Sequence, residues 1–380
     1  MTGITRLSRP ARRCLITGGA GFIGANFVHY WSNQYPEGLV IVLDALTYAG
    51  NLRSLQELET RQNFLFIRGN ITDEAQIESI FSTYAIDTVF HFAAESHVCR
   101  SIHDPRDFIN TNIVGTFTLL EAARRHWLDV VPPVEGHFHH VSTDEVFGSL
   151  GPEDPRFDER TPYMPNSPYA ASKAGADHLV RAYHHTYGLR TTTTNCSNNY
   201  GPYHFPEKLI PLMILNILRG QALPVYGNGL NVRDWLFVTD HCRAIDAVVE
   251  RGRPGETYAI GGDCERRNID IVNSLCGLLD EAFAKDPALR SRFPHAPAAK
   301  GQSSRSLISF VADRPGHDLR YAINGAKIGQ ELGFQPLETL ETGLAKTVAW
   351  YLENESWWRP ILDGSYNDWI ELQYGSRSAA

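Results

Sequence analysis

Residues 14–27, with the sequence CLITGGAGFIGANF, decide the fold of this 380-residue chain. Residues 14–17 predict a short buried strand, and Gly18, Gly21 and Gly24 precede a run of helix-forming residues. In a strand–turn–helix unit, such glycines permit a tight turn, close approach of the backbone to a pyrophosphate, and close packing of helix on strand. The free N–H groups and positive dipole end of the helix can then bind phosphates. Although a glycine-rich turn alone is a weak signal, this context predicts a dinucleotide site.

The next strand, LVIVLD, ends in Asp44 about 20 residues beyond the last glycine, where an acceptor for a ribose hydroxyl belongs. An acid at this position also repels a 2′-phosphate, and the following residue, Ala45, is not basic. The sequence therefore predicts NAD rather than NADP as the cofactor.

Strands and helices continue to alternate through the first half of the chain. A strand is predicted at 64–70, a helix at 72–84, a strand at 87–94, and a helix from Pro105 to about His126. This order implies right-handed crossovers and a parallel sheet. We expect an α/β protein, a Rossmann-type doubly wound parallel sheet with a smaller mixed α/β C-terminal substrate domain. The predicted cofactor domain is 12–199, with 232–255 returning to it, and 200–374 mainly form the substrate domain.

Composition narrows the classes of protein that this chain can belong to. A net charge of -8 argues against nucleic acid as the main partner. The sequence has no run of about 18 apolar residues, so no membrane-spanning helix is predicted. The six cysteines form no CxxC pair, and the neighbouring histidines 139–140 and 184–185 cannot jointly bind a metal, so we predict no metal site. A cytoplasmic protein is expected, and its basic N-terminal segment is predicted to be a disordered tail, with a transit peptide as the alternative. The Ala-, Pro-, Ser- and Arg-rich segment 284–306 predicts a surface loop that is free to move.

Residues 137–148, HFHHVSTDEVFG, predict a strand that ends in Thr143, Asp144 and Glu145. In a doubly wound fold, ligands bind at the carboxyl ends of the strands. Two adjacent carboxylates alone are more often a solvated turn. Carboxylates in different environments can, however, hold different protonation states and act as the acid and base of an elimination.

A later helix, opened by Pro168, carries Tyr169 and Lys173 on one face, four residues apart. A phenol titrates near ~10, and an adjacent ammonium group would pull the pKa of Tyr169 toward neutrality. This pairing suits removal of a proton from a sugar hydroxyl while hydride leaves its carbon. Any helix can hold such a pair, but here it follows a dinucleotide fold and a strand that ends in Thr143.

These motifs resemble the extended short-chain dehydrogenase/reductases, through TGGAGFIG, Asp44 and YAASK. Within that family, the chain is most similar to the dTDP-glucose 4,6-dehydratase group. The similarity rests on HFAAESHV, STDEVFG, SPYAASKAGADHLVRAY, NCSNNYGPYHFPEKLIP, RDWLFVTDH, ADRPGHDLRYAIN and WIELQYG, which together span nearly the whole chain.

The resemblance implies a carbon–oxygen lyase that binds dTDP-glucose and uses tightly held NAD+, which is regenerated in each turnover. Hydride leaves C4 of the glucose while Tyr169, aided by Lys173 and Thr143, takes the hydroxyl proton. Glu145 then removes the C5 proton, and Asp144, which its surroundings must keep protonated, protonates the departing C6 oxygen. Hydride returns to C6 and gives dTDP-4-keto-6-deoxyglucose.

The resemblance also assigns binding residues and a homodimer, joined by a four-helix bundle of the helices that Pro105 and Pro168 open. The implied cofactor residues are Gly18, Gly21, Phe22, Ile23, Gly24, Asp44, Thr47, Asn70, Ile71, Ala93, Ala94, Thr111, Tyr169 and Lys173. The implied substrate residues are Ser96, Thr143, Asn198, Lys208, Leu209, Arg233, Asn268, Arg314, His317 and Tyr374.

Four residues depart from the usual pattern of the group: Ala45, Asn70, Cys99 and Phe147. Asn70 stands where an acid usually meets the adenine amino group, and we expect its side-chain carbonyl to accept that hydrogen bond instead. None of the four removes a catalytic group, so they concern cofactor affinity and packing rather than the reaction.

Other functions remain open at this point. UDP-glucose 4-epimerases share the fold but need no elimination pair, and GDP-mannose or UDP-sugar dehydratases are further candidates. A non-catalytic NAD-binding sensor is a remoter alternative, because fold alone does not establish activity. Neither the choice between thymidine and uridine nor the downstream pathway follows from the sequence.

Overall fold

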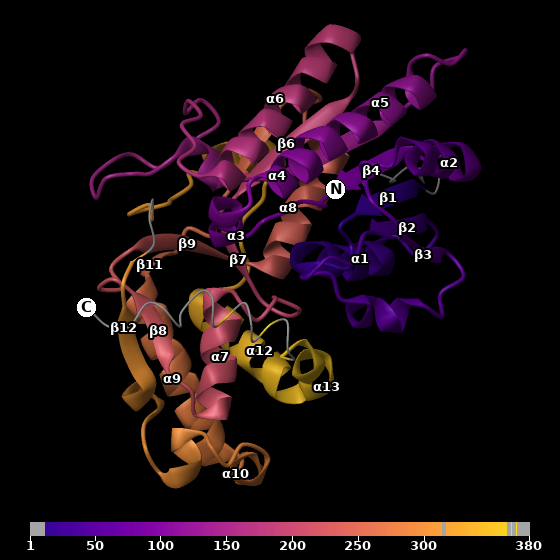
Figure 1. Cartoon of the computed structure of the whole chain (residues 1–380). Coiled ribbons are helices and arrows are strands. Elements are labelled where there is room, and N and C mark those ends of the chain that lie inside the picture. The colour runs from indigo at the N-terminus through magenta and orange to yellow at the C-terminus, as the bar shows by residue number, and fades with distance from the viewer. Residues whose placement is uncertain (1–11, 314–316, 363–365, 367–369, 371–380) are drawn as a thin grey trace, which may run out of the picture.

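A parallel sheet of seven strands forms the first part of the molecule (Figure 1). The computed structural model describes residues 12–313, 317–362, 366 and 370. The strand order is β10-β6-β5-β4-β1-β2-β3, and every neighbouring pair is parallel. The strands are β1 (Arg13–Thr17), β2 (Leu39–Asp44), β3 (Phe64–Arg68), β4 (Thr88–His91), β5 (His137–Thr143), β6 (Thr191–Cys196) and β10 (Thr257–Ile260).

Helices cover both faces of this sheet. Leu15 and Ile41 pack with α2 (Glu74–Tyr84), α5 (Thr116–Trp127) and α6 (Pro168–Tyr187), whereas their neighbours Cys14 and Val40 pack with α1 (Phe22–Gln34) and α8 (Val238–Arg251). Successive strand residues point to opposite faces, so these are the two layers of a doubly wound fold. The predicted fold class is confirmed. None of the helices in the described ranges is long and apolar enough to span a membrane.

The second part of the molecule, which lies below the main sheet in Figure 1, has two small sheets. It also has an apolar core of its own. In the three-stranded sheet, β9 pairs antiparallel with β11 and parallel with β7; β8 and β12 form a parallel pair. The strands are β7 (Asn198–Tyr200), β8 (Leu223–Tyr226), β9 (Val232–Phe237), β11 (Glu265–Arg267) and β12 (Ile308–Val311). The helices in this part are α7 (Leu209–Arg219), α9 (Asn268–Lys285), α10 (Ala288–Arg292), α12 (Leu340–Glu353) and α13 (Glu355–Trp358).

The chain crosses between the two parts more than once. The chain passes from one sheet to the other at Ser197, because β6 lies in the main sheet and β7 in the three-stranded sheet. β9 stays in the second part, while α8 packs on α1 and β10 joins the main sheet beside β6. Helix α11 (Ala326–Leu332) also packs on α8 and β10. The crossings bring residues from both parts to the edge of the main sheet.

The helix predicted from Pro105 is present, and it contains a wide turn. It comprises α4 (Arg106–Phe108), a π-helical segment (Ile109–Gly115) and α5, and it follows the short α3 (Val98–His103). The π segment carries Asn112, whose amide oxygen accepts from the Glu95 N–H at 2.9 Å and whose amide nitrogen donates to the Glu95 carbonyl at 3.0 Å. Such turns often occur at functional sites. This one fixes the loop that follows β4.

The prediction of a loop that is free to move at 284–306 is wrong. The segment folds into α10 and two 3₁₀ turns, Pro297–Lys300 and Ser304–Leu307, and buries Leu289, Phe293 and Ala296 in the core of the second part. The Asp280 carboxylate of α9 accepts hydrogen bonds from Ser303 and Ser304. Apolar residues spaced among small polar ones dock the segment, although its composition is typical of a loop.

Replacing Phe293 tests whether this segment is docked. Phe293 is buried and lies 6.4 Å from the ring of Trp358, so Phe293→Ala should lower the free energy of unfolding by about 3 kcal/mol or more. The matched control is Phe310→Ala, which truncates a half-exposed phenylalanine of β12 and should cost about 1 kcal/mol or less. Equal losses in chemical denaturation would contradict a docked segment.

Candidate active site

The glycine-rich turn lies between β1 and α1, at the carboxyl edge of the main sheet. Gly18 has φ +70°, and a Cβ there would come within 2.6 Å of the Ala93 nitrogen at the end of β4. A Cβ on Gly24 would come within 2.1 Å of the Gly18 carbonyl oxygen. Gly21 precedes α1, whose first turn has no side-chain cap, and residues 21–24 line the pocket described below. The turn has the close approaches that the sequence predicts for a pyrophosphate cradle.

Asp44, at the end of β2, holds the same turn from the other side. Its carboxylate accepts hydrogen bonds from the Ala20 N–H at 2.9 Å and the Leu46 N–H at 2.8 Å. Burial raises the pKa of Asp44, and these two N–H groups oppose the rise. An acceptor at this strand end suits the hydroxyls of a ribose.

Thr143, Asp144 and Glu145 form the junction of β5 and a 3₁₀ turn, Asp144–Phe147. The Thr143 hydroxyl accepts from the Glu145 N–H at 3.3 Å and donates to Asp144 Oδ1 at 3.4 Å. Asp144 is 2% exposed, and its Oδ2 has no hydrogen-bond partner within the described ranges. Burial first, then the charges of Glu145 and Asp234, raise the pKa of Asp144 well above its usual range. The two neighbouring carboxyls therefore have different environments.

Tyr169 and Lys173 face this strand end from the first turns of α6. The helix is started by Ser167, whose side chain accepts from the Ala170 N–H, and by Pro168 in the first turn. Lys173 Nζ donates to the Val141 carbonyl at 2.8 Å. The prediction that Lys173 pulls the pKa of Tyr169 toward neutrality is wrong for the protein alone. Burial and the charge of Glu145 raise the pKa of Tyr169 well above 10, and burial lowers that of Lys173.

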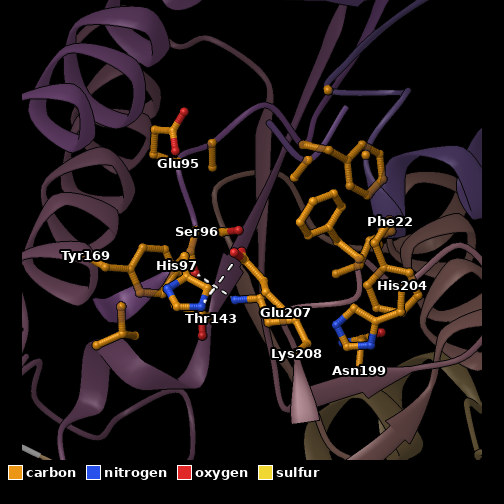
Figure 2. A pocket seen from close by; sticks show the side chains of 18 of the residues that line it. Phe22, Glu95, Ser96, His97, Thr143, Tyr169, Asn199, His204, Glu207 and Lys208 are labelled. Carbon is orange, nitrogen blue, oxygen red and sulfur yellow. Dashed lines mark hydrogen bonds and ion pairs between the residues drawn. The ribbon is translucent and has the colours of Figure 1, made fainter. Parts of the chain in front are cut away.

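One pocket of about 450 Å³ gathers these groups (Figure 2). Every predicted catalytic and cofactor residue lines it, from the glycine turn through Thr47, Asn70, Ile71 and Thr111 to Lys173. The predicted substrate residues that line it are Ser96, Thr143, Asn198, Lys208, Leu209, Arg233, Asn268 and His317. Arg314 and Tyr374 lie outside the described residues. The part of the chain that the structure describes contains no His, Cys, Asp and Glu cluster suited to a metal.

Residues from the second part supply polar groups to the pocket. Arg233 of β9 is buried, donates to the carbonyls of Val232 at 2.7 Å and Asp318 at 3.0 Å, and lies 4.3 Å from the ring of Tyr321. The side-chain oxygens of Asn198 and Asn268 are buried without hydrogen-bond partners in the ranges described. These acceptors suit the hydroxyl groups of a ligand, because a buried polar atom is costly unless it is paired.

Sequence reasoning missed a charged cluster between the two parts. Glu207, which precedes α7, accepts from Arg100 at 3.2 Å and lies 3.8 Å from His97, and Arg100 stacks on Tyr48 at 3.8 Å. Burial raises the pKa of Glu207. The one available signal was the Glu207–Lys208 pair inside the otherwise apolar run HFPEKLIP.

His204 was also missed. Figure 2 shows its ring against Phe22, across the pocket from Tyr169; the two ring centroids are 4.0 Å apart. Because Phe22 begins α1 and His204 belongs to the segment before α7, this stack joins the dinucleotide side of the pocket to the second part.

The structure also shows what three of the unusual residues do. The Asn70 side-chain oxygen accepts from the N–H and the hydroxyl of Thr72, both at 3.0 Å, and Asn70 lines the pocket, so a hydrogen bond from adenine to this oxygen stays a prediction. Cys99 is buried and lines the pocket. Phe147 packs against Phe157 at 5.1 Å and Tyr163 at 5.2 Å.

The chain is similar to known enzymes that act on sugar nucleotides. The class is that of sugar-nucleotide 4,6-dehydratases, since a family model described as GDP-mannose 4,6 dehydratase matches residues 15–347. A dTDP-glucose 4,6-dehydratase from Neisseria meningitidis is 55% identical over 359 residues, 93% of this chain and 97% of that protein. The chain belongs to the dTDP-glucose 4,6-dehydratase family.

Solved structures agree with this family. The dTDP-glucose 4,6-dehydratase from Bacillus anthracis, in complex with NAD, has a TM-score of 0.79 and 45% identity, covering 92% of this chain and 100% of that one. The enzyme from Streptomyces venezuelae, with NAD and TDP bound, has a TM-score of 0.80 and 45% identity, covering 92% and 99%.

Substitution of Gly18 tests the close approach at the glycine turn. Gly18→Ala should lower stability by about 2 kcal/mol or more and remove any dinucleotide that copurifies, because the Cβ would meet the Ala93 backbone. Gly188→Ala is the control: φ is +74° there, but nothing lies within 4 Å of the added Cβ, so only a backbone cost of about 1 to 2 kcal/mol is expected. Dinucleotide released by denaturation is measured for both variants. Full occupancy in Gly18→Ala would contradict the assignment.

Proposed function

We propose that this chain converts dTDP-glucose into dTDP-4-keto-6-deoxyglucose and water with a bound NAD+ that each turnover regenerates. The observation that carries the proposal is the pair Asp144 and Glu145, one buried with a raised pKa and the other lining the pocket, beside Tyr169 and Lys173. A dehydratase needs an acid, a base and a hydride site, and this pocket offers residues for each.

The cofactor site is formed by residues whose shapes fit a dinucleotide. NAD+ supplies a group that accepts hydride from C4 and returns it to C6. The turn from Gly18 to Gly24 would hold the pyrophosphate, and Asp44 the adenosine ribose. Ala93 and Ala94 present small side chains to the pocket, and Lys173 would bind the second ribose.

Tyr169 is the proposed base for the C4 hydroxyl. Its phenol is buried and has a raised pKa in the protein alone, so deprotonation needs a positive charge close by. Lys173 lies one helical turn away, and the Thr143 hydroxyl opposes the rise in the pKa of Tyr169. We propose that Thr143 relays the proton between the sugar hydroxyl and Tyr169.

Asp144 and Glu145 are the proposed elimination pair. The 4-keto group acidifies the C5 hydrogen, which Glu145 would remove. Burial and neighbouring negative charges raise the pKa of Asp144, which favours the protonated carboxyl that would donate its proton to the departing C6 oxygen. Asn198, Lys208, Arg233, Asn268 and His317 would hold the sugar and the diphosphate, with Ser96 and Leu209 completing this wall.

Incubation of the purified protein with dTDP-glucose, without added NAD, tests this function. We expect loss of one water by mass and a 4-keto product, which would also show that NAD is carried by the protein. A product of unchanged mass would indicate an epimerase. If GDP-mannose or UDP-glucose reacts and dTDP-glucose does not, the substrate is a different sugar nucleotide. If none of the three reacts even when NAD is added, the protein binds NAD without catalysing the reaction.

Substitutions of the acid and the base should stop the reaction at different steps. Asp144→Asn should lower the dehydration rate by about 10²-fold or more, because an amide cannot supply the proton, yet substrate recovered from D2O should carry deuterium at C5. Glu145→Gln should abolish both dehydration and exchange while hydride transfer from C4 still reduces the bound nicotinamide. Mass and absorbance distinguish these outcomes. Deuterium at C5 in Glu145→Gln would contradict its role as base.

We also propose a division into a cofactor domain, residues 12–199 with α8 and β10, and a substrate domain formed mainly by residues 200–374. A cytoplasmic location is proposed as well. Its support is that all six cysteines are free thiols, as expected for a protein kept in a reducing compartment.

A second copy of this chain is the proposed partner for α5 and α6. Four large apolar residues along α3 to α5, the segment that packs beside α6 (Figure 1), are between 41% and 45% exposed, and exposed apolar side chains that lie together mark interaction surfaces. They are Ile102, Ile109, Val114 and Phe117. A pair of such surfaces would form a four-helix bundle across a two-fold axis.

A charge on this surface should disrupt the dimer. Phe117→Asp is expected to convert a dimer into a monomer in light scattering, because a buried unpaired carboxylate is costly at an interface. The control is Leu337→Asp, which places the same charge at an exposed leucine outside these helices and should leave the mass unchanged. A wild-type monomer, or a Phe117→Asp dimer, would refute this interface.

A further inference from the structure

Asp177 is a buried carboxylate that no step above uses. It lies on α6, one helical turn beyond Lys173, and is 5% exposed. Four side chains donate hydrogen bonds to it: His140 Nε2 at 3.1 Å, the Ser142 hydroxyl at 2.8 Å, the Tyr163 hydroxyl at 2.8 Å and Asn195 Nδ2 at 3.2 Å. Because an ionised carboxylate only accepts, the His140 ring must carry its proton on Nε2.

The donors to Asp177 come from the elements that carry the reacting groups. His140 and Ser142 belong to β5, and Ser142 immediately precedes Thr143. Asn195 of β6 donates a second hydrogen bond, to the Thr143 carbonyl at 3.1 Å. Asp177 therefore ties α6, with Tyr169 and Lys173, to the strand end that presents Thr143, Asp144 and Glu145.

Asp177 is also the negative charge that faces Lys173. Burial lowers the pKa of Lys173, and Asp177 acts against that change. Burial by itself would raise the pKa of Asp177. The pKa is nevertheless lowered, because the opposing effects are larger: the hydrogen bond and charge of His140, the charge of Lys173 and the hydrogen bond from Ser142. The other titratable groups that face Lys173 are His91 on β4, His140 on β5, Cys196 on β6, and Tyr169 on its own helix.

None of those neighbours can replace Asp177 as a counter-ion. Burial and the charge of Lys173 lower the pKa of His140 to about 4, so its ring is neutral at pH 7. Burial raises the pKa of Cys196 to about 12, so its thiol is neutral as well. A lysine in such a site loses its proton readily unless an opposite charge stabilises it.

We propose that Asp177 is a positioning residue for the dehydration, which holds Lys173 in its charged form and fixes the end of β5 beneath the substrate. This inference rests on the proposed function, because it concerns the C4 oxidation that Tyr169 and Lys173 carry out. Asp177 lies outside the pocket, but by keeping Lys173 charged it would help the Tyr169 phenol to ionise. If Lys173 were neutral, the nearest positive charge to that phenol on α6 would be absent.

The pH dependence of Asp177→Asn tests this role. The substitution keeps the size of the side chain and removes its charge, so the pKa of Lys173 should fall further. Activity requires charged Lys173 and is lost as pH rises through that pKa. The alkaline limb of kcat/KM should therefore move to lower pH by about 1 unit or more, with a larger loss of kcat at pH 8 than at pH 6.

Asp246→Asn is the matched control. Asp246 of α8 also accepts hydrogen bonds from two tyrosine hydroxyls, those of Tyr30 and Tyr35 at 2.7 Å, but these belong to α1 and its C-cap and not to the elements that carry the reacting groups. This variant should lose stability without any shift of the pH profile. A shift in both variants, or an unshifted profile in an active Asp177→Asn, would refute the positioning role. An inactive wild-type protein would instead refute the proposed function.

A second variant, Tyr163→Phe, tests the same role if Asp177→Asn does not fold. It removes one donor and leaves the carboxylate, so the pKa of Asp177 should rise while its charge persists at high pH. The acid limb of kcat/KM should move to higher pH and the alkaline limb should stay in place. Two unmoved limbs would contradict the proposal, since Asp177 would then not control the charge at Lys173.

Discussion

Parallel pairing of the central strands is the constraint on which the site depends. Thr17 pairs with His91 across β1 and β4, and Thr143 pairs with Cys196 across β5 and β6. The four strands therefore end at one edge, and the turn after β1, the loop after β4 and the 3₁₀ turn after β5 all open into one pocket. Right-handed crossovers place the N-terminus of α1 at that edge, beside the position for an anionic group. A shift of one strand by a residue would separate the glycine turn from Ala93.

The pKa values of two buried carboxyls near this edge are shifted in opposite directions. Asp144 receives one long hydrogen bond, from Thr143, and the charges of its neighbours Glu145 and Asp234 add to burial in raising its pKa. Asp177 is equally buried but receives four hydrogen bonds and faces Lys173, so its charge is retained. Both carboxyls are buried, so the number of hydrogen-bond donors and the signs of the neighbouring charges decide the direction of each pKa shift. An acid and a permanent anion can thus sit on adjacent elements of one fold.

Motifs with short sequence spacing were predictable, and long-range electrostatics were not. The glycine turn, Asp44 and the Tyr169–Lys173 pair each depend on local geometry that spacing encodes, and all line the pocket. The pKa of Tyr169 depends on Glu145 and on burial, which no spacing reveals, and its predicted direction was wrong. The hydrogen bond from the Thr72 N–H to the Asn70 side-chain oxygen is local as well, but sequence reasoning did not predict it. Segment 284–306 failed because docking by Leu289 and Phe293 overrides a loop-like composition.

An acidic chain that binds a nucleotide diphosphate must rely on short-range groups, because its net charge of -8 repels anions at a distance. Arg233 meets this need through rigidity: two carbonyls and the face of Tyr321 hold its guanidinium inside the pocket, so binding an anion costs little side-chain entropy. Lys208 is tied less tightly, through the Ser96 carbonyl at 3.3 Å. Such contacts act over a few ångströms and are shielded from ions in solution. The binding of the proposed substrate should therefore depend more on the integrity of the pocket than on ionic strength.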